Sequence, residues 1–164
     1  MKDGTANSEQ GDQNRPIILV AIDFSHCSLL ALEKAKSWAS AHNGKILALH
    51  VIDQGFIKLC IQQKLGTGKE IRNQLFRYAR SRLAELLRKQ GLGKEDSEMI
   101  VCEGFPCIEI NKKAVESKAE MIVMGSQGNS DDMKKIFFGS TTERVLRFIK
   151  RPVLCVPPES DYKA

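Results

Sequence analysis

Positions 16–22 read Pro16-Ile-Ile-Leu-Val-Ala-Ile22, a short apolar run that is rich in β-branched residues. A strand with one face in water alternates apolar and polar residues, whereas a strand buried on both faces is apolar throughout. Strands of the second kind occur in parallel sheets that helices cover on both sides. The run therefore predicts a central strand of an α/β protein.

Four more runs of this kind follow along the chain. They are residues 45–52, 98–103, 121–124 and 152–156. Segments with the apolar spacing of helices separate them, at about 26–43, 71–91, 106–118 and within 138–150. Residues 53–68 are less regular and predict a loop with a short helical piece. Because crossovers between parallel strands are right-handed, this order predicts a doubly wound, five-stranded parallel sheet with helices on both faces.

Two glycines and one proline mark predicted helix ends. Gly44 and Gly91 each follow an apolar helical stripe, where a residue in the left-handed conformation commonly ends a helix. Pro106 opens a helix, because the missing proline N–H costs nothing in a first turn.

Length and composition predict one globular domain. The chain has 164 residues, of which 42% are hydrophobic and 27% are charged. We expect the domain to span 16–158, with a disordered polar tail at 1–15 and a short tail at 159–164. No apolar stretch reaches the roughly 18 residues of a membrane span, and no signal peptide is recognisable. These features predict a cytoplasmic protein that does not enter a membrane.

The positive charge has a mainly structural interpretation. The net charge is +5, and basic proteins attract nucleic acids. However, many of the cations fall between Lys69 and Lys89, interleaved with apolar residues at helical spacing. No aromatic stacking pattern accompanies them, so a solvated helix face is favoured over a nucleic-acid surface.

The cysteines and histidines do not predict a metal site. The five cysteines are Cys27, Cys60, Cys102, Cys107 and Cys155, and no two have C-x-x-C spacing. The histidines are His26, His42 and His50, without ligand spacing to cysteine or carboxylate. We interpret the cysteines as reduced thiols and the histidines as structural residues.

The strongest functional signal follows the fourth predicted strand. Gly125-Ser-Gln-Gly128 comes directly after it, and Gly139-Ser140-Thr141 comes before the next helix. Glycines let the main chain approach an anion closely, and the N-terminus of a helix presents free N–H groups to phosphates. The alternative is structural, with glycines that only shape a turn and with Ser140-x-x-Glu143 as a capping box. Lys134 and Lys135 would either assist the phosphates or be solvated.

Asp23 follows the first strand and is expected at the same edge of the sheet, where ligands of such sheets bind. Its carboxylate could accept a hydrogen bond from a base or a ribose. Alternatively, Asp23 or Ser25 caps the next helix. Val51, at the end of the second strand, could offer main-chain groups to a base, although an apolar strand residue is ordinarily part of the core.

Several motifs of other nucleotide sites and enzymes are missing. Gly66-Thr-Gly-Lys-Glu70 departs from the phosphate loop GxxxxGK[ST], and no GxGxxG follows the first strand. No nucleophile elbow GxSxG is present. No catalytic residues are therefore predicted.

Several segments together resemble the universal stress protein family. They are Ile17-Ile-Leu-Val-Ala-Ile-Asp-Phe-Ser25, Leu49-His-Val-Ile-Asp53, Met121-Ile-Val-Met-Gly-Ser-Gln-Gly128, Gly139-Ser-Thr-Thr-Glu-Arg-Val145 and Arg151-Pro-Val-Leu-Cys-Val156. The resemblance implies a Rossmann-like fold, similar to that of adenine nucleotide alpha hydrolases. It also implies a homodimer formed by antiparallel pairing of the last strands, here 152–156.

ATP-binding members of that family carry the pattern G-x2-G-x9-G-[S/T]. The resemblance implies that Asp23 and Val51 lie at the adenine end, and that Met124 flanks the sugar or base. It places Gly125, Gln127 and Gly128 along the ribose and phosphates, and Gly139, Ser140 and Thr141 on the phosphates. The implied ligand is ATP, with AMP or ADP as alternatives and Mg²⁺ held only through the nucleotide.

This chain departs from the pattern at one point, because ten residues separate Gly128 from Gly139. Asp131 and Asp132 in this stretch would either repel a triphosphate or help to hold its Mg²⁺. Three functions stay open: a dimeric module that reports nucleotide state to an unknown partner, a slow ATPase or self-phosphorylating protein, and a nucleotide-free scaffold dimer.

Overall fold

A computed structural model describes residues 15–128 and 138–158. The elements in chain order are β1 (Ile17–Ala21), α1 (His26–Ala41), β2 (Lys45–Asp53), α2 (Gln54–Gln62), α3 (Gly68–Lys89), β3 (Ser97–Gly104), α4 (Pro106–Glu116), β4 (Met121–Gly125), α5 (Ser140–Arg147) and β5 (Val153–Val156). The predicted tails 1–15 and 159–164 lie outside the described residues, except for Arg15.

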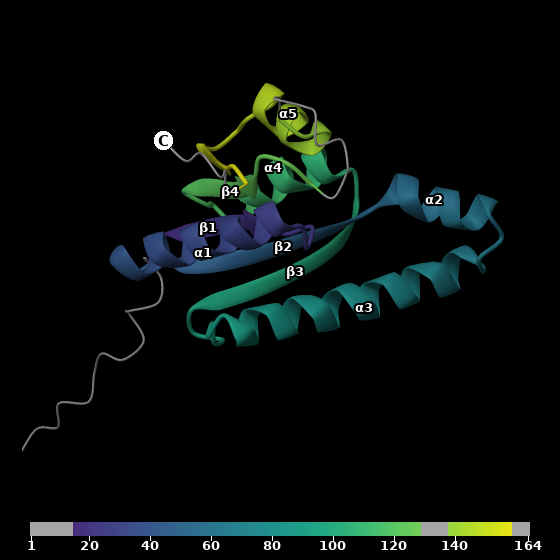
Figure 1. Cartoon of the computed structure of the whole chain (residues 1–164), viewed down its shortest axis with the longest axis horizontal. Coiled ribbons are helices and arrows are strands. Elements are labelled where there is room, and N and C mark those ends of the chain that lie inside the picture. Colours follow the sequence, from purple (N-terminus) through teal and green to yellow (C-terminus); the bar gives the residue numbers. More distant parts are fainter. Residues whose placement is uncertain (1–14, 129–137, 159–164) are drawn as a thin grey trace, which may run out of the picture.

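The five strands form one parallel sheet in the order β3-β2-β1-β4-β5 (Figure 1). β1 lies at the centre, with Val20 paired to Ala48 of β2 on one side and to Val123 of β4 on the other. Ile18, Leu19 and Val20 are fully buried. The prediction of a doubly wound parallel sheet is therefore confirmed.

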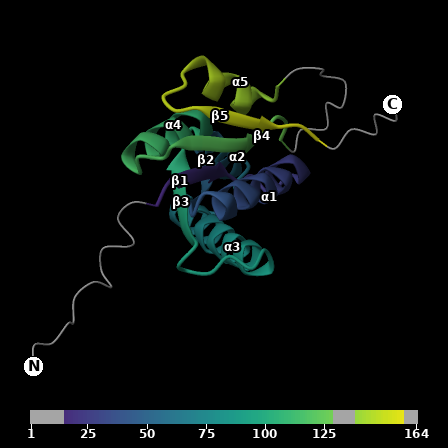
Figure 2. The same ribbon diagram turned by 90° about the vertical axis from the view of Figure 1, so that its left-hand side faces the viewer.

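Helices cover both faces of the sheet (Figure 2). Ile18 and Val20 of β1 belong to a core cluster that includes buried residues of α1 and α3, such as Leu32 and Leu83. Leu19 and Ala21 point to the opposite face, because successive side chains of a strand alternate. There they join a second cluster that includes Ile110 of α4 and Val145 of α5.

The strand order reverses between β1 and β4. From β1 the chain continues outward to β2 and β3, and it then returns to β4 and β5 on the other side. The crossover helices that follow β1 and β4 consequently lie on opposite faces and leave a crevice at the carboxyl ends of these strands.

One predicted helix end is wrong and another is correct. Gly91 has a φ of 70°, as predicted, whereas after α1 the left-handed residue is Asn43, with a φ of 50°. Asparagine tolerates this conformation because its short side chain can bond locally. Gly44 is needed for close packing instead, since a Cβ there would lie 2.8 Å from Ile18 Cδ1 and 3.1 Å from the Pro16 carbonyl oxygen.

Residues 53–68 contain more helix than predicted. α2 spans nine residues and begins after Asp53, whose side chain accepts a hydrogen bond from the Gly55 N–H. Ile57 and Cys60 are buried in a cluster with Ile71 of α3. A two-turn helix shows little periodicity, so its contact with α3 is visible only in three dimensions.

No helix in the described part of the chain is long and apolar enough to cross a membrane.

Candidate functional site

A pocket of about 280 Å³ opens at the carboxyl ends of β1 and β4. The structure brings all nine residues singled out from the sequence to its wall: Asp23, Val51, Met124, Gly125, Gln127, Gly128, Gly139, Ser140 and Thr141. Seven other lining residues were not predicted from the sequence, namely Ala21, Ile22, Ser28, Leu49, Pro106, Ile110 and Thr142. Most of these seven residues have the apolar spacing of core positions. Nothing in the neighbouring sequence distinguishes a core residue from one that lines a cavity.

The loop after β1 places Asp23 at the pocket. Ser25, and not Asp23, is the N-cap of α1, and its hydroxyl accepts a hydrogen bond from the Ser28 N–H at 3.2 Å. Both the N–H and the hydroxyl of Ser25 donate to Asp23 Oδ1, the N–H at 2.9 Å. The capping residue thus orients the Asp23 carboxylate, which lies on the pocket wall.

Gly125 permits close contact between β4 and the start of α1. A Cβ at this position would lie 2.6 Å from Cys27 Cβ, 2.9 Å from the Cys27 carbonyl carbon and 3.0 Å from the Ser28 nitrogen. A Cβ atom essentially never lies closer than 3.0 Å to a heavy atom to which it is not bonded. The glycine therefore has a packing role in addition to lining the pocket.

Gly128 lies beside Asp23 on the pocket wall. A Cβ on Gly128 would lie 2.9 Å from Asp23 Oδ2, and Gly128 is itself exposed. A side chain there would consequently enter the space beside the carboxylate.

The start of α5 contradicts the capping-box interpretation of Ser140 and Glu143. The N-cap is Gly139 and no side chain caps the helix, so Ser140 is the first helical residue, one position too late for a cap. Glu143 instead forms an ion pair with Arg147 at 3.1 Å. The Ser140 and Thr141 side chains are thus available to the pocket they line.

Two hydrogen bonds attach the start of α5 to the end of β4. The buried Thr142 hydroxyl donates to the Gly125 carbonyl oxygen at 2.9 Å, and the Gly139 N–H donates to the Ser126 carbonyl oxygen at 2.8 Å. The first bond spans 17 positions of the chain, a separation at which no sequence pattern could have revealed Thr142.

The pocket has an apolar inner wall and a polar rim. Leu49, Ile110 and Met124 are buried core residues that line it. The rim has main-chain N–H groups and hydroxyls at the N-terminus of α5, where a helix is electrically positive. No lysine or arginine is among the described lining residues. Residues 129–137, in the stretch that is one residue longer than the pattern, lie outside the described residues. They include Asp131, Asp132, Lys134 and Lys135.

Known proteins are similar to this chain over almost its whole length. The sequence matches the family model described as Universal stress protein family over residues 14–157. The chain belongs to the universal stress protein family. It is 30% identical over 152 residues to universal stress protein MJ0577 of Methanocaldococcus jannaschii, covering 85% of this chain and 93% of that protein.

Solved universal stress protein structures share the fold. The structure of MJ0577 superposes with a TM-score of 0.75 at 29% identity, over 89% of this chain and 98% of that one. A universal stress protein solved in complex with cAMP has a TM-score of 0.55 at 26% identity, over 88% of this chain and 98% of that one.

His50 makes a contact in this universal stress protein that its sequence did not indicate. Its Nδ1 lies 2.7 Å from the Ile22 carbonyl oxygen. A carbonyl oxygen only accepts, so Nδ1 carries the hydrogen and donates. Burial, the largest cause, lowers the pKa of His50 below its ordinary value of 6.5.

This shift makes stability dependent on pH. As the pH falls below about 6.5, the unfolded chain protonates this histidine before the folded protein does, so the free energy of unfolding should decrease with decreasing pH. His50→Gln keeps an N–H donor but cannot titrate, and its stability should decline less steeply over the same range. Urea unfolding between pH 5 and pH 7.5, read by circular dichroism, measures both slopes; equal slopes would contradict the assignment.

The histidine, cysteine and acidic side chains do not form a metal centre in the described part of the chain. No group of three or more His, Cys, Asp or Glu side chains there could hold a metal ion. All five cysteines are free thiols. Burial raises the pKa of Cys27, Cys102 and Cys155, which keeps these thiols protonated and weakly nucleophilic at neutral pH.

Proposed function

We propose that this universal stress protein binds an adenine nucleotide, ATP in preference to AMP or ADP, in the pocket at the carboxyl ends of β1 and β4. Asp23 and Val51 would contact the adenine and ribose, with Met124 beside them. The phosphates would follow the main chain past Gly125, Gln127 and Gly128 to Gly139, Ser140 and Thr141.

One observation carries this proposal. Residues from the ends of β1, β2 and β4 and from the start of α5 line a single pocket at the reversal of strand order. Its apolar wall suits a flat aromatic base, while its N–H groups and hydroxyls suit an anionic chain. The relative solved with cAMP supports an adenine nucleotide as the class of ligand.

The residues present fit Mg²⁺ only as a companion of the nucleotide. Asp23 is the sole carboxylate among the described lining residues. Mg²⁺ commonly keeps several waters and binds through one or two carboxylates and substrate phosphates, so the ion would be held mainly by the phosphates of the nucleotide and by water.

The proposed role is that of a cytoplasmic homodimer which reports nucleotide state to a downstream protein. β5 forms the edge of the sheet, and Leu154, Phe148 and Ile149 are exposed apolar residues on it or just before it. Antiparallel pairing of two copies along 152–156 would cover this edge. Light scattering that gives the mass of a monomer would contradict the dimer.

Nucleotide binding can be tested directly. The purified protein is denatured and any released small molecule is identified by mass spectrometry; separately, calorimetry measures the binding of ATP, ADP and AMP. We expect an adenine nucleotide in the first experiment and the tightest binding for ATP in the second. No heat of binding at millimolar nucleotide would overturn the proposal and favour the nucleotide-free scaffold.

A slow ATPase or self-phosphorylating activity is the second candidate, because the hydroxyls of Ser140 and Thr141 line the pocket. Cation-dependent phosphate release that survives stringent purification and disappears in Ser140→Ala would favour it.

A further inference from the structure

The loop that carries Asp23 contains a residue in an unfavourable backbone conformation. Phe24 has a φ of 62°, in the left-handed region that costs a non-glycine residue of this size appreciable energy. Such conformations persist only where the surroundings hold them, and they gather at functional sites. The neighbours of Phe24 therefore bear on the position of Asp23.

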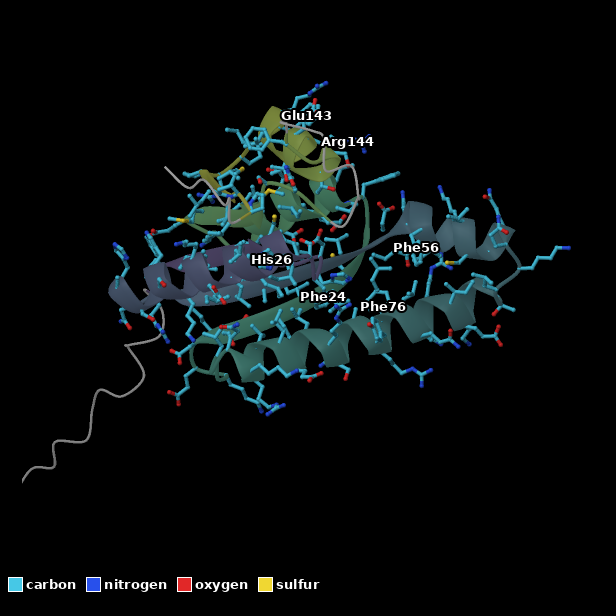
Figure 3. The ribbon with its side chains drawn as sticks, viewed as in Figure 1. Phe24, His26, Phe56, Phe76, Glu143 and Arg144 are labelled. Atoms are coloured by element: carbon cyan, nitrogen blue, oxygen red, sulfur yellow. The ribbon has the colours of Figure 1, made fainter. Side chains whose placement is uncertain are left out.

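Two elements outside the loop hold Phe24. Its ring centroid lies 4.7 Å from that of His50 on β2, tilted by 38°. The guanidinium carbon of Arg82 on α3 lies 4.3 Å from the Phe24 ring centroid, within the range of a cation–π interaction. Figure 3 shows Phe24 between the sheet and α3.

The residue before Asp23 is also fixed from β2. His50 Nδ1 donates to the Ile22 carbonyl oxygen at 2.7 Å, and the Ile22 N–H donates to the Leu49 carbonyl oxygen at 2.8 Å. Asp23 is thus held on both sides along the chain, and its carboxylate is oriented by Ser25. Arg82 does not line the pocket. Among the described residues it contacts the Phe24 ring and donates a hydrogen bond to the Tyr78 hydroxyl at 3.3 Å.

We propose that Arg82 and His50 are positioning residues that clamp Phe24 in its left-handed conformation and thereby hold Asp23 against the bound nucleotide. This inference rests on the proposed nucleotide-binding function. Without the clamp, Phe24 relaxes toward the right-handed region, and the Asp23 carboxylate leaves the pocket wall. Helix α3, which lies outside the site, thereby sets the affinity of the site.

Arg82→Ala is the decisive variant, because Arg82 is exposed and its removal leaves the core intact. Calorimetry should show that AMP and ATP both bind about threefold to tenfold more weakly, by the same factor, since Asp23 serves the adenosine part that they share. Arg82→Lys retains a cation over the ring and should restore most of the affinity. Arg80→Ala, on the same helix and also exposed, is the matched control and should bind as the wild type does.

A second measurement separates this inference from the proposed function. Hydrogen exchange of the ligand-free protein follows the Ser25 amide, which donates to Asp23. Exchange should be faster in Arg82→Ala and unchanged in Arg80→Ala. If the wild type binds no nucleotide, the proposed function fails, yet faster exchange would still establish the clamp. Wild-type exchange in Arg82→Ala, or a loss of affinity confined to ATP, would overturn the inference.

Discussion

Gly125→Ala should lower the free energy of unfolding by about 2 kcal/mol, in the range measured for overpacked cores. The added Cβ would meet Cys27 Cβ at 2.6 Å, the Cys27 carbonyl carbon at 2.9 Å and the Ser28 nitrogen at 3.0 Å. Two of these atoms are main chain of α1, so no side-chain rotation can relieve the contact. To accommodate the methyl group, α1 must move away from β4 and disturb the core between them.

Urea unfolding of the wild type, Gly125→Ala and Gly93→Ala measures this effect. Gly93 is the control because it is exposed and a Cβ there would meet nothing within 4 Å. Gly93→Ala should match the wild type or be slightly more stable, since alanine restricts the unfolded chain. A Gly125→Ala protein as stable as Gly93→Ala would show that α1 and β4 are not in close contact.

Gly128→Val should weaken nucleotide binding about hundredfold, or about 2.7 kcal/mol, with little effect on stability. Gly128 is exposed, so a larger side chain does not overpack the core. Its Cβ would nevertheless lie 2.9 Å from Asp23 Oδ2 and direct the valine methyl groups into the space assigned to the nucleotide. Main-chain N–H groups could then no longer approach the phosphates.

Gly128→Ala provides a graded comparison, because one methyl group requires only a small shift of Asp23. Its affinity should lie between those of the wild type and Gly128→Val. Calorimetry gives the affinities, and the rise of the melting temperature with added ATP gives an independent measure. Wild-type affinity in Gly128→Val would place the nucleotide elsewhere and remove the proposed phosphate path.

The architecture could be predicted because it depends on local patterns. An apolar run such as Ile17–Ala21 indicates burial on both faces, and five such runs alternating with helical stripes leave few topologies. The prediction was poorer where an element is short. α2 has nine residues, and its helical state depends on packing of Ile57 against α3, which no local pattern contains.

The candidate site, too, could be predicted from the sequence only in part. Glycines and hydroxyls after β4, and Asp23 after β1, could be placed at one edge because all strands of a parallel sheet end there. The choice between binding and capping could not be made from sequence for Ser140, because it depends on a one-residue difference in where α5 begins.

The sequence by itself determined the buried strands, their alternation with helices and the edge of the sheet at which small and hydroxyl residues gather. Only the tertiary structure decided that Thr142 bonds to Gly125, that Ser25 orients Asp23, and that His50 and Arg82 both contact the Phe24 ring. Hydrophobic periodicity is a property of neighbouring residues, so it reports which face is buried. Contacts between residues distant in the chain are fixed by packing of whole elements, and they leave no periodic signal in the sequence.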